Sequence, residues 1–173
     1  CKFSDITVFS FHPVKIITSG EGGVATTNNK KLAEKMSTFR AHGIIREKSK
    51  FIGKSHGPWF YQQQYLGFNY RLNDLQAALG ISQLKKLDNF VSKRTNIYRK
   101  YNSIFENDKD VILPYQNSQT KSSFHLYILR IKKKGKLDRK VIFEKLRNNG
   151  IFVNIHYIPI YKQPFYEKDY ISK

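Results

Sequence analysis

The chain has 173 residues, of which 40% are hydrophobic, and its 31 Lys and Arg against 13 Asp and Glu give a formal net charge of +18. This length and composition predict one domain of ordinary size, or a large piece of a bigger protein, and exclude a disordered tail. No apolar run is long enough to cross a bilayer and no signal peptide opens the sequence, so we expect no membrane partner. A single cysteine, Cys1, excludes a disulfide framework and favours a cytoplasmic location. We also expect the chain to be cut at both ends.

The first part of the chain predicts two strands, a helix and a long loop. Residues 6–11 (ITVFSF) alternate weakly and residues 23–27 (GVATT) follow a glycine-rich turn, so both are predicted strands. Asparagines before residues 30–41 and Gly43 after them predict a capped helix with a glycine stop. Residues 44–66 are basic and aromatic without periodicity, which predicts a long irregular loop that is functional or mobile.

Two helices are predicted next. Asn73 and Gln76 have the spacing of a capping box, and a helix is predicted from there because leucines recur at helical spacing. These leucines are Leu72, Leu75, Leu79, Leu84 and Leu87. A further helix is predicted over residues 92–106, where Ile97, Tyr101, Ile104 and Phe105 are apolar.

The last part of the chain predicts a strand, a helix and a strand, over residues 122–131, 138–149 and 151–160. This order is typical of a small α/β domain attached to the end of a larger one. We therefore expect residues 1–91 to belong to the larger domain, and residues 92–173 to form a linking helix and the small domain.

Lys15 stands in an unusual setting within FSFHPVKIITSGEGGVATTN, residues 9–28. It follows a short apolar strand and precedes a glycine-rich turn, and no acidic residue follows it before Glu21. Apolar surroundings favour the neutral, nucleophilic form of an amine, so a lysine placed here suits imine chemistry. The GEGG run at residues 20–23 lacks the spacing of a nucleotide-binding motif, and we interpret it as a tight turn past Lys15.

Three segments of the chain, in this order, carry a family resemblance: FSFHPVKIITSGEGGVATTN, LGFNYRLNDLQAALGISQL and GIFVNIHYIPIYKQPFY. Together they resemble the pyridoxal-phosphate-dependent nucleotide-sugar aminotransferases, the DegT/DnrJ/EryC1/StrS family. Within the family, the segments HPVKIITSGEGG, SSFHLYILRI and VNIHYIPI are most similar to the branch of pseudaminic acid biosynthesis, which aminates C4 of a UDP-linked 4-keto-6-deoxy-N-acetylhexosamine. The resemblance implies the C-terminal portion of a fold-type I α/β enzyme. It also implies a homodimer, glutamate as amino donor and pyridoxal phosphate as cofactor.

The resemblance also implies roles for single residues. Lys15 corresponds to the lysine that forms the internal aldimine with pyridoxal phosphate and then moves a proton as general base and acid. Ser10 corresponds to a serine that hydrogen-bonds the cofactor phosphate, and alternation turns it away from its phenylalanine neighbours. Asn69 corresponds to an asparagine that binds the phosphate in the neighbouring subunit's site. Arg71 is a nearby candidate for substrate binding, since guanidinium suits a phosphate dianion.

Three further candidates are more ambiguous. His156 and Tyr157 resemble the family's substrate-side pair, but a partly buried structural histidine explains the pattern equally well. His12 is a candidate for cofactor or substrate contact, or packs beside Pro13. His125, inside an apolar strand, is interpreted as structural, and no cluster has metal-ligand spacing, so no metal is expected.

The loop from residues 46 to 61 is expected to order over the nucleotide part of the substrate, because it combines cations with aromatic rings. A solvated insertion without substrate contact is the equal alternative. Other rivals concern the whole protein: an aminotransferase for another keto-sugar, a dehydratase relative, or a basic nucleic-acid-binding module. A dehydratase relative would carry histidine in place of Lys15. A nucleic-acid module needs a concentrated basic face, whereas these lysines are dispersed and their densest run, at 132–136, suits a solvated turn.

Overall fold

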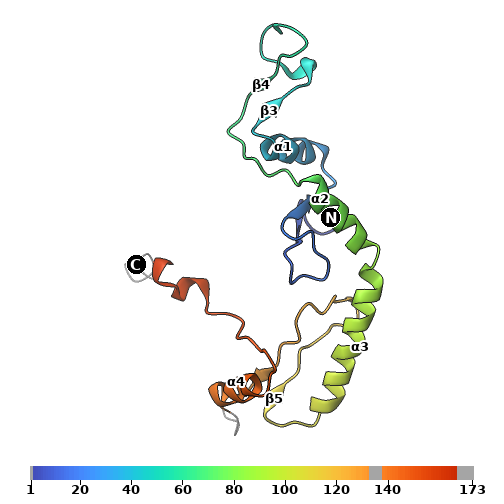
Figure 1. Cartoon of the computed structure of the whole chain (residues 1–173), viewed down its shortest axis with the longest axis vertical. Coiled ribbons are helices and arrows are strands. Elements are labelled where there is room, and N and C mark those ends of the chain that lie inside the picture. Colours follow the sequence, from blue (N-terminus) through green and yellow to red (C-terminus); the bar gives the residue numbers. More distant parts are fainter. Residues whose placement is uncertain (1, 133–137, 167–173) are drawn as a thin grey trace. The chain divides into compact units, whose positions relative to one another are not determined.

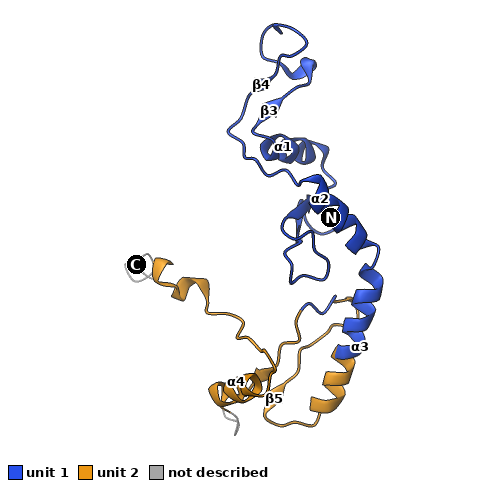
Figure 2. Ribbon diagram, viewed as in Figure 1, with its two compact units in different colours: residues 1–97, 123–125 blue, residues 98–122, 126–173 orange. Residues whose placement is uncertain are grey.

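The computed structural model describes residues 2–132 and 138–166. The chain divides into two compact units (Figure 2): Cys1–Ile97 with Ser123–His125, and Tyr98–Ser122 with Leu126–Lys173. The expected domain boundary between residues 91 and 92 stays a prediction about the larger enzyme. The predicted turn at residues 133–136, Cys1 and the last residues of the chain lie outside the described residues. Among the helices that are described, none combines the length and the apolar character needed to cross a bilayer.

The first unit opens on the predicted hairpin (Figure 1). β1 (Thr7–Ser10) pairs antiparallel with β2 (Gly23–Thr26), and Ser10 lies opposite Gly23. The chain then turns into α1 (Lys30–Arg40), whose first turn is capped by the Asn29 side chain. That carboxamide oxygen accepts hydrogen bonds from two backbone N–H groups of the first turn, which otherwise have no partner inside a helix. The predicted strands and helix are confirmed here.

The segment after α1 is more regular than the sequence predicted. β3 (Ile44–Ile45) pairs antiparallel with β4 (Gln62–Gln63), and a single 3₁₀ turn, η1 (Lys48–Lys50), follows β3. The interpretation of residues 44–66 as wholly irregular is therefore wrong. Strand periodicity did not reveal the pairing because each strand has only two residues.

Two consecutive helices follow this segment. α2 (Asp74–Leu84) begins with the predicted capping box, in which the Asn73 and Gln76 side chains each accept from the other residue's backbone N–H. α3 (Leu87–Phe105) begins earlier than the predicted residue 92, since the backbone already forms the helical hydrogen bond from Phe90 to Lys86.

In the second unit, β5 (Val111–Ile112) pairs antiparallel with β6 (Arg130–Ile131), α4 (Arg139–Asn148) is capped by the Asp138 side chain, and η2 (Ile160–Lys162) follows. The predicted helix is confirmed.

Of the two strands predicted on either side of α4, the first is confirmed only at its end and the second is wrong. Of residues 122–131 only the last two form β6, because β5 offers just two residues to pair with. No residue of 151–160 is a strand, and the N–H of Val153 instead closes a local turn onto the carbonyl of Ile151. Alternating apolar residues predict a strand only where a neighbouring strand supplies the hydrogen bonds.

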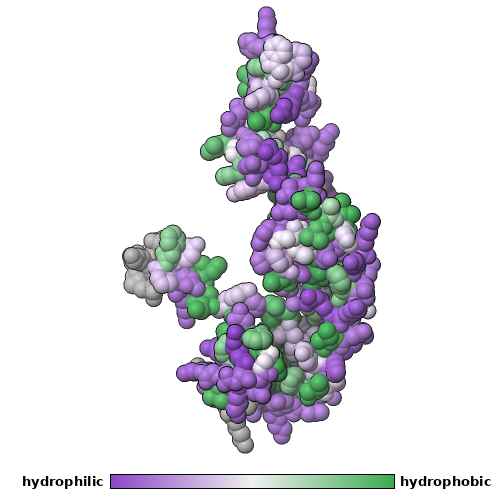
Figure 3. All heavy atoms as spheres, in the orientation of Figure 1, coloured by the Kyte–Doolittle hydropathy of each residue, from purple (hydrophilic) through white to green (hydrophobic). Residues whose placement is uncertain are grey.

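Few side chains of this chain are buried. Among the described residues Val111 is the buried apolar side chain and Ser19 the buried polar one. Many large apolar residues are exposed, and Figure 3 shows them spread over the visible face. Exposed apolar surface on this scale marks positions that normally contact other protein surface.

Candidate active site

Lys15 lies on a closed turn between β1 and β2. Its N–H donates to the carbonyl oxygen of His12 at 2.9 Å, and at the base of the turn the N–H of Phe11 donates to the carbonyl of Gly22 at 2.9 Å. Inside the turn, the Phe11 carbonyl accepts from the Ser19 N–H at 3.1 Å and from the Thr18 hydroxyl at 2.8 Å. These hydrogen bonds fix the backbone that carries Lys15, whose own side chain is half-buried.

Thr18 is a residue that the sequence did not single out. Its hydroxyl donates to the Phe11 carbonyl and accepts from the N–H of Gly20 at 2.9 Å, so it connects both sides of the turn. A threonine that accepts from the N–H two residues later is a known turn motif, and the TSG run at residues 18–20 carried that signal.

The glycines at residues 20–23 have a geometric role, as predicted. Gly20 and Gly22 have φ values of +83° and +116°, which favour glycine. A Cβ on Gly22 would lie 2.9 Å from Cδ1 of Leu72, and one on Gly23 would lie 2.5 Å from the carbonyl oxygen of Phe9. The Lys15 turn therefore packs closely against the residue that precedes the α2 cap.

Ser10 and His12 lie on the strand side of this turn. The Ser10 hydroxyl oxygen accepts a hydrogen bond from the N–H of His12 at 3.4 Å, which leaves its hydrogen free to be donated. The His12 Nε2 atom lies 3.8 Å from Oε1 of Glu21, and both side chains are exposed. His12 thus has a contact across the turn and does not pack beside its proline neighbour alone.

Asn69 lies on an extended segment that is paired with the end of α1. The N–H of Phe68 donates to the carbonyl of Phe39 at 2.8 Å, and the N–H of Tyr70 donates to the carbonyl of Arg40 at 2.9 Å. The Phe68 and Tyr70 rings stack at 5.0 Å with an interplanar angle of 9°. Because side chains alternate along an extended segment, Asn69 and Arg71 point away from these rings. Both are exposed.

His156 and Tyr157 belong to the second unit. Their ring centroids are 3.8 Å apart, and Tyr157 is 74% exposed. The structure describes each unit by itself, so it brings Lys15, Ser10 and His12 together on one turn but does not bring this pair to them. His125 lies in the first unit, where its carbonyl oxygen accepts a hydrogen bond from Nη1 of Arg94 at 3.2 Å.

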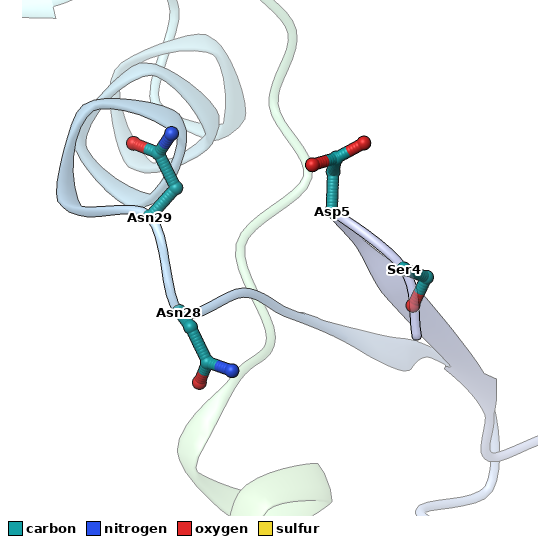
Figure 4. A pocket seen from close by; sticks show the side chains of 4 residues that line it. All are labelled: Ser4, Asp5, Asn28 and Asn29. Atoms are coloured by element: carbon teal, nitrogen blue, oxygen red, sulfur yellow. The ribbon is translucent and has the colours of Figure 1, made fainter. Parts of the chain in front are cut away.

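The side chains of the Lys15 turn fit the group that the resemblance implies. A half-buried primary amine suits covalent attachment of an aldehyde, and a hydroxyl with a free hydrogen suits a phosphate oxygen. A separate depression is lined by Ser4, Asp5, Asn28 and Asn29 at the start of α1 (Figure 4). None of the candidate residues lines it, and the Asn29 side chain already caps the helix.

Comparison with known proteins supports this interpretation. The chain is 39% identical over 167 residues to the UDP-4-amino-4,6-dideoxy-N-acetyl-beta-L-altrosamine transaminase of Campylobacter jejuni strain 81-176. That alignment covers 96% of this chain and 42% of the transaminase. The chain thus spans about two fifths of the length of the curated relatives it matches.

Solved aminotransferase structures also match this chain. PseC of Helicobacter pylori, an aminotransferase involved in the biosynthesis of pseudoaminic acid, matches with a TM-score of 0.85 and 36% identity. The match covers 96% of this chain and 42% of PseC. The PLP form of Spr1654 from Streptococcus pneumoniae matches with a TM-score of 0.81 and 27% identity, over 95% of this chain and 41% of Spr1654.

These neighbours have the α/β fold of sugar aminotransferases, and the PLP form indicates pyridoxal phosphate as the cofactor. The model of the DegT/DnrJ/EryC1/StrS aminotransferase family matches residues 1–173. The chain belongs to this family of enzymes.

Proposed function

We propose that the protein containing this chain transfers an amino group from glutamate to the C4 keto group of a UDP-linked 4-keto-6-deoxy-N-acetylhexosamine, with pyridoxal phosphate as cofactor. The observation that carries the proposal is Lys15, a half-buried amine on a turn closed by hydrogen bonds, in a chain of an aminotransferase family. The similarity to the altrosamine transaminase supports the choice of sugar.

Four residues of the first unit have a chemical task in this proposal. Pyridoxal phosphate, when bound, supplies the electron sink that stabilises negative charge on the substrate carbon. The Lys15 Nζ atom would hold the cofactor, and as a free amine it would take a proton from the substrate carbon that carries the nitrogen and then donate it as general acid. Ser10 donates its free hydroxyl hydrogen to a phosphate oxygen. The Asn69 amide and the Arg71 guanidinium add donors of the kind that phosphate accepts.

We further propose a homodimer in which Asn69 serves the partner's site. Its support is the exposed apolar surface around Asn69, where Leu66 is 85% exposed, Tyr70 71% and Leu75 85%. Surface of this kind is typical of positions that another protein surface covers. His156 and Tyr157 stay candidates for substrate contact, and a cytoplasmic location stays a prediction.

The test of the reaction is Lys15→Ala in the complete protein, with Lys31→Ala as matched control because Lys31 is an exposed lysine in α1. We expect Lys15→Ala to lose transamination and the absorption of lysine-bound cofactor while the circular dichroism of the fold is retained. Lys31→Ala is expected to keep both. Turnover near wild type in Lys15→Ala would reject the assignment.

The substrate is tested separately. The wild-type protein is assayed with glutamate and UDP-linked 4-keto and 3-keto sugars. We expect preference for the 4-keto N-acetyl sugar, and faster turnover of any other keto-sugar would favour the alternative of a different family substrate.

A further inference from the structure

Residues 46–61, between β3 and β4, form a segment that we call the arm. The sequence predicts that the arm orders only when substrate binds. The structure instead shows the arm held at its base by side-chain hydrogen bonds and ion pairs.

Gln62 fastens the arm with both ends of its amide. Its Oε1 atom accepts from the N–H of Ile52 at 2.8 Å, and its Nε2 atom donates to the carbonyl oxygen of Ile52 at 2.8 Å. This is the pair of hydrogen bonds that a neighbouring strand residue would make. Gln64 supports it, because its Nε2 atom donates to Oε1 of Gln62 and to the carbonyl of Lys50, each at 2.8 Å.

Lys50 adds an ionic connection. Its Nζ atom lies 2.7 Å from Oε2 of Glu47 inside the arm and 3.4 Å from Oε2 of Glu34 on α1. The hydrogen bond with Glu47 raises the pKa of Lys50, and the same bond lowers the pKa of Glu47. Lys50 is therefore committed to the protein's own carboxylates and is poorly placed to serve a substrate diphosphate.

Other groups of the arm that suit a nucleotide diphosphate are Arg46 and Tyr61 at its two ends and Trp59 near the second end. The Arg46 guanidinium lies over the Tyr61 ring at 5.1 Å, an arrangement that orients its donors. The Trp59 side chain is 76% exposed and lies against Gly57, where a Cβ would come within 2.7 Å of the indole. A cation and aromatic groups of the arm thus contact other residues of the arm.

We propose that Gln62 is a positioning residue for the nucleotide-sugar half-reaction and acts by holding the arm in place. The arm in turn keeps the Arg46–Tyr61 stack and Trp59 oriented before the nucleotide diphosphate binds. This rests on the proposed function. A pre-oriented binding group loses less conformational entropy on binding, so loosening the arm weakens binding of the nucleotide sugar while glutamate is unaffected.

The experiment uses the complete protein and four forms: wild type, Gln62→Ala, Gln62→Glu and Gln63→Ala. Gln63 is the matched control, since its amide is exposed and donates to the carbonyl of Tyr65, outside the arm, at 3.3 Å. The two half-reactions are followed separately through the cofactor absorbance. We expect Gln62→Ala to raise KM for the UDP-linked sugar about tenfold with kcat little changed, because the two hydrogen bonds to Ile52 that hold the arm are lost. Gln62→Glu keeps an oxygen that accepts from the N–H of Ile52, so we expect its KM to lie between those of wild type and Gln62→Ala.

A second measurement needs no substrate. Hydrogen exchange read by mass spectrometry should show faster exchange over residues 50–52 in Gln62→Ala and not in Gln63→Ala. An unchanged KM in active Gln62→Ala, or equal damage to the glutamate half-reaction, would overturn the positioning role. A wild-type protein without either half-reaction would overturn the proposed function itself, and the role of Gln62 with it.

Discussion

Gly67→Ala should damage the segment that presents Asn69. A Cβ on Gly67 would overlap the backbone nitrogen of Gly43 and lie 2.5 Å from the carbonyl carbon of His42. No side-chain rotation relieves this overlap, because both neighbours are backbone atoms. The two chain segments must therefore separate.

The expected magnitude follows from the hydrogen bonds that hold the segments together. Three backbone bonds link residues 68–70 to residues 39–42, at the end of α1 and just beyond it, at 2.8, 2.9 and 2.9 Å, two of them made by Phe68 and one by Tyr70. At about 1 kcal/mol each, their loss lowers the free energy of unfolding by about 3 kcal/mol. Urea denaturation of the complete protein measures the change, and affinity for pyridoxal phosphate should fall with it if Asn69 binds the phosphate.

Gly80→Ala is the matched control, because it puts the same methyl group into the same unit without a clash. Gly80 lies in α2, and its Cβ would meet only the Ser19 Cβ at 3.7 Å, an ordinary contact. Alanine is the better helix former, so this variant should gain up to about 1 kcal/mol. Equal stability of Gly67→Ala and wild type would refute the steric reasoning.

Further predictions concern the partner subunit, the arm and the second unit. Mixing Asn69→Ala with Lys15→Ala subunits should restore one intact site per heterodimer, and mixed dimers as inactive as both parents would show that Asn69 does not act in trans. Arg46→Ala should raise KM for the nucleotide sugar and leave the glutamate half-reaction intact, which single-turnover absorbance checks. Tyr127→Phe should cost about 1 kcal/mol in urea denaturation, since the Tyr127 hydroxyl donates to Asn102 Oδ1 at 2.7 Å. Burial raises the pKa of the Tyr127 hydroxyl, so the stability that its protonated form contributes is present below pH 10 and lost above it. A wild-type free energy of unfolding that stays level above pH 10 would contradict this prediction.

The elements that the sequence predicted correctly are those whose signals lie in neighbouring residues. The β1–β2 hairpin follows from a weakly alternating segment before a glycine-rich turn and a second segment after it, and α1 and α2 begin at asparagine caps whose hydrogen bonds the structure contains. Family membership was also recognisable, because three blocks in order carry it. The geometry around Lys15 was partly foreseen, in the glycines that close its turn.

What the sequence could not predict depends on partners distant along the chain. Gln62 reaches Ile52, ten residues earlier, through its side chain, and no periodicity records such a bond. The failed strand has the same cause, since residues 151–160 are rich in apolar side chains but pair with no strand in the described part of the chain. Local sequence patterns indicate which secondary structure a segment prefers, and tertiary contacts determine which one it adopts.

The two parts of the candidate site are stabilised differently, and this bears on how the enzyme is assembled. The Lys15 turn is closed by its own hydrogen bonds, so its backbone geometry depends on neighbours within the same unit. The segment of Asn69 is paired with α1 through its backbone, yet Leu66, Phe68 and Tyr70 beside it are largely exposed. Burying such side chains contributes about 25 cal/mol for each Å² covered, so the segment of Asn69 gains this stability, beyond that of its backbone hydrogen bonds, only when another surface covers them. We therefore expect changes at the subunit interface to weaken phosphate binding by Asn69 more than they weaken cofactor binding through Lys15.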